Sequence, residues 1–405
     1  MPSKLSWLDH DAAAAQRSLQ ILSYFEEREA RDELGIGGIR DAVADQLFPG
    51  TSTIQTRLRY VFFVPWLFDQ LEAKSTASSN FPDAARESEN RLLAALIENT
   101  KAAEPGVIGR EAGSSLKRLP SSVYWATLGS WGMRKADSSI QQYFALADRR
   151  YELRRQQRRR HDGDAHDGDA TGRVWHAQLA RLRPDDFPRC ATLKLSRSEA
   201  EFLLDRWKLA HPESLLSWLA IDLAEGGAMP EAERIWEHPR KGAFPQPIQV
   251  LIEDARCFDA LIHGAALLYN LQLAELDTRI DLAEEYKARL ESWASSDLSA
   301  CAAWKLDEFW TRVVGKGHSI TDKTQRFVRS WLALALRDRE RIAESAECRA
   351  LVKARECDLK KERSRFTNRA ALSQWGGKAG LVPLSYRWPI ASNFLHEWHD
   401  GWKAA

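Results

Sequence analysis

The chain has 405 residues, 44% of them hydrophobic and 28% charged, and a formal net charge of +1. Its length suits two or three domains, and its composition excludes a disordered chain. Its charge excludes a protein that is basic throughout and coats nucleic acid by bulk attraction, but leaves room for a local basic patch.

The five cysteines are scattered and form no C-x-x-C pair, so neither a disulfide framework nor a cysteine zinc site is expected. This pattern favours a reducing compartment. The polar N-terminus has no apolar run typical of signal peptides, and we expect a cytoplasmic protein without a membrane partner. The sixteen tryptophans predict mainly core anchors, with base stacking as the alternative.

Hydrophobic periodicity predicts helices through the first hundred residues. One helix is expected over 12–30, and a short one over 41–47 ends at the Pro-Gly pair that follows it. Thr51 or Ser52 is then expected to cap a further helix. After a loop rich in Ser, Ala and Asn, another helix is expected over 87–100.

Residues 107–135 have the pattern of a helix-turn-helix unit. A short helix is followed by the turn KRLP, and a second helix begins at Ser121 or Ser122. The segment 132–140 is compatible with the hairpin of a winged variant. The unit therefore predicts a DNA-binding element in this half of the chain.

Residues 149–160 carry seven arginines against one glutamate, and 161–172 contain a five-residue duplication, HDGDA. The duplicated segment has nothing but alanine to bury, which predicts a solvated linker. The expected organisation is an N-terminal helical domain at 1–155, an acidic flexible linker at 156–173 and a C-terminal helical domain at 174–405.

The second half also reads as helical. Ser196 and Glu199 form a capping box, and helices are expected over 247–293, 321–347 and 389–402. The predicted fold class is therefore mainly α and multi-helical, in two domains, with the helix-turn-helix unit in the N-terminal half.

The motifs predict no catalytic residue, metal site or cofactor. The two His-Asp dipeptides lie within the duplicated linker rather than on rigid helices, and His396 and His399 lack a third ligand. The glycine-rich segments at 35–38 and 375–380 match no phosphate-loop pattern, so turns are preferred there.

A nuclease site built on scattered carboxylates stays open as an alternative. Glu356, Asp358 and Lys360 have the required residue types, although solvated charge on a helix is the simpler explanation.

Nucleic-acid binding has more support. Between Arg110 and Arg160 there are twelve Lys or Arg against four Asp or Glu, and phosphate contacts need such a local excess. The alternative is a merely solvated basic face. The residues expected to bind nucleic acid are Arg57, Arg59, Lys117, Arg118, Ser121, Ser122, Arg134, Lys135, Arg149, Arg150, Arg154, Arg155, Arg158 and Arg159. A second basic stretch covers 353–369.

Arg57 and Arg59 enter that set because they follow Gly50-Thr51-Ser52-Thr53. Free N–H groups at a helix start, two hydroxyls and two arginines one turn later suit a phosphate. The alternative is a helix cap with surface arginines paired to Asp41 or Asp45.

The N-terminal block resembles the hallmark of a bacterial family of unknown function. Its parts are a W-x-D segment at 7–9, RDELGIG-x-IRD at 31–41, LFPGTSTIQTR-x-RY at 47–60 and F-x-PW at 63–66. The segments around 120–125, 131–132 and 386–388 are also similar, so the resemblance spans nearly the whole chain.

The resemblance implies a place in anti-phage defence gene clusters, in the company of helicases and phospholipase-D-like nucleases. It assigns no residue a catalytic role. The favoured reading is a non-enzymatic, DNA-binding component of such an assembly. The alternatives are a helical interaction scaffold without nucleic-acid contact and a metal-dependent nuclease with scattered ligands.

Overall fold

The computed structural model describes residues 32–102, 104–160, 173–229, 232–296 and 298–404. Within these ranges every regular element is a helix, apart from one isolated bridge between Arg134 and Trp175. The expected mainly α, multi-helical class is confirmed. The helix expected over 12–30 lies outside the described residues. In the ranges described, no helix combines the length and the apolar character that crossing a membrane requires.

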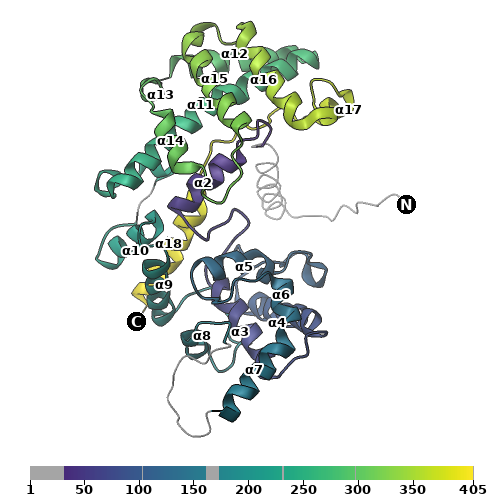
Figure 1. Cartoon of the computed structure of the whole chain (residues 1–405), viewed down its shortest axis with the longest axis vertical. Coiled ribbons are helices and arrows are strands. Elements are labelled where there is room, and N and C mark those ends of the chain that lie inside the picture. The colour runs from purple at the N-terminus through teal and green to yellow at the C-terminus, as the bar shows by residue number, and fades with distance from the viewer. Residues whose placement is uncertain (1–31, 103, 161–172, 230–231, 297, 405) are drawn as a thin grey trace. The chain divides into compact units, whose positions relative to one another are not determined.

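The described residues group into two compact units (Figure 1). Unit 1 takes its residues from Met1–Ala44 and Arg234–Tyr386, and unit 2 from Asp45–Glu233 and Arg387–Ala405. The linker predicted at 156–173 falls within the sequence range of unit 2, and its residues 161–172 lie outside the described part. The linker therefore stays a prediction. The boundaries between the two compact units fall at other positions, after Ala44, Glu233 and Tyr386.

Helix α2 (Gly37–Leu47) leads into unit 2. The helices of unit 2 are α3 (Tyr60–Ala73), α4 (Phe81–Asn99), α5 (Pro120–Ser130), α6 (Ile140–Ala145), α7 (Ala147–Arg160), α8 (Ala177–Leu182), α9 (Arg197–Ala210), α10 (Leu215–Ala224) and α18 (Trp388–Lys403). Those of unit 1 are α11 (Gln246–Leu276), α12 (Ile280–Ser295), α13 (Ser299–Ala302), α14 (Leu306–Val313), α15 (Asp322–Arg337), α16 (Ala346–Lys360) and α17 (Arg369–Ser373).

Helix α3 forms the centre of unit 2 and is buried along most of its length. Phe68 packs against Tyr143, Trp125 and Trp175 at ring-centroid distances of 5.6, 6.2 and 6.3 Å. Most tryptophans of the described residues are likewise buried. This agrees with their predicted role as core anchors, because each indole removes a large apolar area from water.

The prediction that a helix starts at Thr51 or Ser52 is wrong, because helix α3 starts only at Tyr60. The Tyr124 hydroxyl accepts hydrogen bonds from the backbone N–H groups of Thr56 (3.0 Å) and Arg57 (3.1 Å), and the Glu397 carboxylate accepts one from Leu58 (2.7 Å). Partners distant in the sequence thus take the N–H groups that a helix would have used. The periodicity of apolar residues gives no information about these distant hydrogen-bond partners.

The helix-turn-helix unit expected at 107–135 has only its second helix. Residues 107–119 form turns and one 3-10 turn, η1 (Gly113–Ser115), instead of an α-helix. Helix α5 buries seven of its eleven residues, and only Ser122 and Ala126 are fully exposed. A recognition helix must offer one face to a DNA groove, and here the core of unit 2 takes up nearly every face.

Unit 1 is built around the 31-residue helix α11. The indoles of Trp293 and Trp331 donate hydrogen bonds to the carbonyls of Ala260 and Leu261, both at 2.8 Å. Asn270 holds the returning segment 375–386 by accepting from Ala379 N (2.8 Å) and donating to Ala379 O (2.6 Å). The WGGKAG segment is therefore a braced turn.

Gly264 sets how closely α11 and α12 approach. A Cβ atom there would lie 2.4 Å from the Trp293 ring, so we expect Gly264→Ala to destabilise unit 1 by about 1–3 kcal/mol. The melting temperature followed by circular dichroism should fall by several degrees. Gly242→Ala is the matched control, because open space surrounds that position. Equal melting temperatures for the two variants would contradict the predicted close packing.

Candidate functional site

The segment 48–56, at the centre of the family-like block, forms a tight loop in unit 2. Gly50 has φ +78°, and a Cβ atom there would lie 2.4 Å from Trp131 Nε1. Trp131 Nε1 donates instead to the carbonyl of Pro49 at 2.9 Å. Only glycine fits this approach, since a side chain would both strain the backbone and displace the indole.

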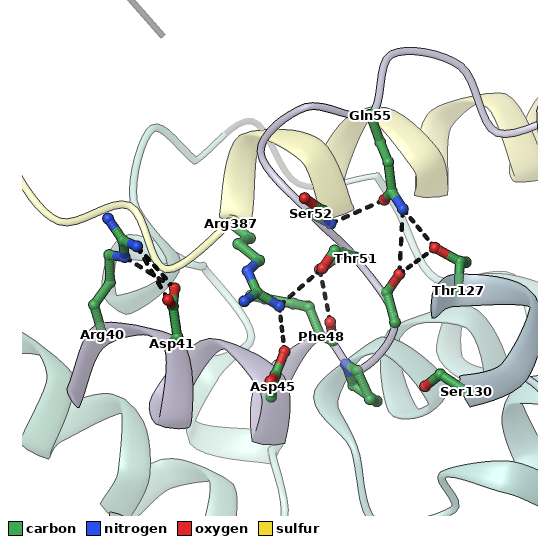
Figure 2. A network of polar contacts seen from close by, with 12 residues as sticks. Arg40, Asp41, Asp45, Phe48, Thr51, Ser52, Gln55, Thr127, Ser130 and Arg387 are labelled. Atoms are coloured by element: carbon green, nitrogen blue, oxygen red, sulfur yellow. Dashed lines mark hydrogen bonds and ion pairs between the residues drawn. The ribbon is translucent and has the colours of Figure 1, made fainter. Parts of the chain in front are cut away.

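A chain of side-chain hydrogen bonds closes the loop onto α5 (Figure 2). Thr127 Oγ1 donates to Gly50 O at 2.7 Å and accepts from Gln55 Nε2 at 2.5 Å. Gln55 Oε1 in turn accepts from Ser52 N at 2.9 Å. The Gln55 amide, and the Thr51 hydroxyl that donates to Phe48 O at 2.6 Å, are thus engaged in the structure of the loop itself.

Arg387 joins this network from the start of α18. It forms an ion pair with Asp45 and donates to Thr51 O at 2.8 Å (Figure 2). Its own backbone is left-handed, with φ +65°, a conformation that a non-glycine residue adopts at some energetic cost. Asp45 therefore pairs with Arg387.

Arg57 and Arg59 point into unit 2. Arg59 pairs with the buried Glu199 at 2.8 Å and donates to Thr192 O at 2.9 Å. Arg57 pairs with Glu397 at 2.6 Å and with Glu104 at 3.1 Å. Both guanidiniums thus have internal carboxylate partners, which favours a structural role over a phosphate site.

The N-terminus of α5 is occupied by a carboxylate of the protein itself. Glu89 accepts from Ser121 N at 2.8 Å and from Ser121 Oγ at 2.7 Å. Burial raises the pKa of Glu89 to about 7, because the charged form is poorly solvated there. A phosphate would have to displace this carboxylate, so Glu89 occupies the position at the N-terminus of α5 that a ligand would need.

Three more of the expected basic residues face inward. Arg134 stacks over the Trp125 ring at 4.7 Å. Arg150 and Arg154 both pair with the buried Glu72, the former at 3.3 Å. These contacts leave one face of α7 covered.

Six of the expected residues are exposed, and they lie before α5, on α5, after α5 and on α7: Lys117, Arg118, Ser122, Lys135, Arg149 and Arg155. Arg158 and Arg159 lie at the end of α7, and their side chains are outside the described part. The structure therefore separates the predicted set into an internal and a surface group.

Ser130 and His211 lie together in unit 2 in a way that resembles a nucleophile and its base. Ser130 Oγ is 2.9 Å from His211 Nε2, and the same nitrogen is 2.8 Å from Ser130 O. Since a carbonyl only accepts, Nε2 carries the hydrogen and cannot take a proton from Ser130. Burial also lowers the pKa of His211. This histidine caps the end of α5.

The carboxylates considered for a nuclease do not converge. Glu356 is fully buried and accepts from Arg365 N at 2.9 Å, while Asp358 is exposed beside Lys323 at 3.5 Å. Lys360 pairs with Glu33 at 3.0 Å. Among the residues that the structure describes, no three His, Cys, Asp or Glu side chains are placed to hold a metal ion.

Sequence reasoning missed the long-range partners of four glutamates that are buried or nearly so. Glu72, Glu89, Glu199 and Glu397 lie on four different helices, and the sequence indicates at most the local capping box of Glu199. Three of their bonds span between 32 and 339 positions, as in the Glu89–Ser121, Glu199–Arg59 and Glu397–Leu58 pairs. No local signal could have revealed them.

A family model matches residues 2–402 of this chain. The chain belongs to DUF6361, a family of unknown function. The search of curated proteins and the search of solved structures found no match. The family membership agrees with the resemblance seen in the sequence and extends along almost the whole chain.

The Thr127 hydroxyl allows a test of the hydrogen-bond network that closes the loop 48–56 onto α5. Thr127→Val keeps the side-chain shape but removes the hydroxyl, so Gly50 O and Gln55 Nε2 each lose a partner. We expect a loss of about 1–3 kcal/mol in the free energy of unfolding, measured in urea. Ser122→Ala on the exposed side of the same helix is the control, with a change below about 0.5 kcal/mol. Similar losses in both variants would argue against the network.

Glu89 predicts a pH dependence. Its folded pKa lies above the ordinary value, so the stability it contributes is present below about pH 4.5 and is lost as the pH rises towards 7. Glu89→Gln cannot ionise and can still bond to Ser121. The melting temperature of the variant relative to the original protein should therefore rise between pH 5 and pH 8. A constant difference over that range would refute the assignment.

Proposed function

We propose that this protein binds nucleic acid through the phosphate backbone, using the exposed basic residues of α7 and of the loop before α5. The observation that carries the proposal is the arrangement of arginines on α7. Arg150 and Arg154 pair with a buried glutamate, whereas Arg149 and Arg155 are exposed on either side of them.

Helix α7 is firmly held for a helix with so few apolar residues. Asp148 accepts hydrogen bonds from Ser78 N at 3.1 Å and from Ser78 Oγ at 2.6 Å. Ala147 and Tyr151 are buried, and Glu72 fixes the next turn through two arginines. Because the helix itself is already fixed, phosphate binding by its exposed arginines carries no cost for ordering the backbone.

The exposed pair Lys117 and Arg118 adds charge in the loop before α5. Neither residue has an ion-pair partner within the described ranges. Because α5 itself is buried, the proposal involves phosphate contacts that fix orientation and carry no base sequence information. It therefore replaces the helix-turn-helix mode of reading the major groove with sequence-independent binding.

We place this activity in a non-enzymatic component of an anti-phage defence assembly in the cytoplasm, on the strength of the family resemblance. A helicase or a phospholipase-D-like nuclease is the proposed partner on the same ground. The second candidate is an interaction scaffold, which one observation favours. Leu276 and Ile280, at the turn between α11 and α12, are 49% and 75% exposed, as expected for a contact surface.

The test is binding of labelled double- and single-stranded DNA across a salt series. For Arg149→Gln/Arg155→Gln we expect weaker binding at low salt. The slope of log affinity against log salt should be shallower by about 2 units, since two phosphate contacts are lost. Lys194→Gln/Lys208→Gln removes two exposed charges elsewhere in unit 2 and should leave the slope unchanged.

Two results would count against the proposal. Absence of binding at low salt would favour the scaffold. An equal effect of both double variants would show attraction by overall charge rather than a defined surface. Because Arg149 and Arg155 are exposed, their variants should keep the original melting temperature.

A further inference from the structure

A second basic surface lies in unit 1, where the C-terminal end of α16 continues through the 3-10 turn η5 (Lys361–Arg363) to α17. We call it the 353–369 surface and define it by the exposed residues Lys353, Lys361, Arg363 and Arg369. None of these four has an ion-pair partner among the described residues. Their charges are therefore available to a ligand.

The backbone of this surface is braced from inside by two buried glutamates. Glu356 accepts from Ser364 Oγ and from Arg365 N, the latter at 2.9 Å. Glu33 pairs with Lys360 at 3.0 Å and with Arg365 at 2.6 Å. The loop that carries Lys361 and Arg363 is thereby fixed in one conformation.

This bracing separates the cations of the segment into two groups. Arg355, Lys360 and Arg365 bond to groups within unit 1, whereas the four surface cations point outward. Burying charged pairs is a weak source of stability, so their value here is in positioning. Lys361 has φ +50°, a costly conformation for a lysine that the bracing maintains.

The opposing charges on this surface are few. Glu362 is exposed beside the basic residues, and Asp358 is paired with Lys323 at 3.5 Å. Four cations therefore face one exposed carboxylate that has no cationic partner within the described part. This local excess contrasts with a chain whose net charge is only +1.

An aromatic ring lies among these cations. Phe366 is half-buried, with Lys353 Nζ 5.8 Å from its ring centroid and the Tyr269 ring packed edge-on at 5.7 Å. A packed ring with Lys353 beside it, in the same segment as Lys361, Arg363 and Arg369, suits an unpaired base whose phosphates the cations bind. The carboxylates of an acidic protein segment offer no aromatic face to stack on Phe366, so the ring favours a nucleic acid.

We propose that the 353–369 surface is a second nucleic-acid site, which binds the backbone of a single strand and stacks a base on Phe366. It lies in unit 1, and it does not depend on the site proposed on α7. Together the two sites would give the chain two separate points of attachment to a nucleic acid.

The test uses the full-length protein and a labelled oligo-dT strand across a salt series. For Lys361→Gln/Arg363→Gln/Arg369→Gln we expect a slope of log affinity against log salt that is shallower by about 2 units, given about 0.7 units per phosphate contact on single strands. The control Lys287→Gln/Lys305→Gln/Lys316→Gln removes three charges elsewhere in unit 1. An unchanged slope in the first variant, or equal changes in both, would overturn the proposal.

Phe366→Leu provides a second readout. It should weaken oligo-dT binding severalfold without changing the salt slope, because stacking contributes affinity but no charge. Unchanged affinity would overturn the stacking assignment. Displacement of the strand by polyglutamate as readily as by unlabelled oligo-dT would instead identify an acidic-protein site and also overturn the proposal.

The Arg149→Gln/Arg155→Gln variant separates the two proposals. If that variant alone weakens binding, the α7 site stands and the 353–369 site fails. If only the triple variant does so, the reverse holds. Additive losses would support both sites.

Discussion

Unit 2 depends on ion pairs that join glutamates which are buried or nearly so to arginines far away in the sequence. Glu199 holds Arg59 at the entrance to α3, Glu397 holds Arg57 from the last helix, and Glu72 holds α7 through Arg150 and Arg154. Each carboxylate loses water on burial, and this cost is offset only while its partner stays in place. Removal of one arginine would leave an uncompensated charge in the core. These pairs therefore specify which segments meet, beyond any modest gain in stability.

The sequence predicted the helical class because apolar spacing and capping are local signals. The capping box of Ser196 and Glu199 and the helix near 389–402 are both present. The prediction failed where contacts with residues far away in the sequence determine the local structure. Residues 51–59 form no helix because Tyr124 and Glu397 accept hydrogen bonds from their N–H groups. In residues 107–135, helix α5 is mostly buried in unit 2 and does not offer a face to a DNA groove.

The same limit applies to the candidate site. The arginine count identified a stretch of the chain that is rich in basic residues. The sequence alone, however, does not distinguish an arginine that is paired inside the unit from one that is exposed. On α7 the distinction depends on Glu72, more than seventy positions away from the arginines it binds. The residues that remain exposed are a small subset, and they share a pattern in both units. A buried carboxylate fixes the backbone through some of the cations, and the neighbouring cations stay exposed.

The last helix has a consequence for how the molecule is made. Helix α18 belongs to unit 2, although residues 234–386 of unit 1 separate it from the rest of that unit. Helix α18 leaves the ribosome only after residues 234–386, so Leu58, Arg57 and Asn393 cannot reach their final arrangement around Glu397 until all of that stretch of unit 1 has been synthesised. Unit 2 therefore stays incompletely folded while the ribosome synthesises the long helix α11 and the helices that pack against it. Loss of α18 would therefore remove the partners of residues made much earlier, such as Leu58, which lies 339 positions before Glu397.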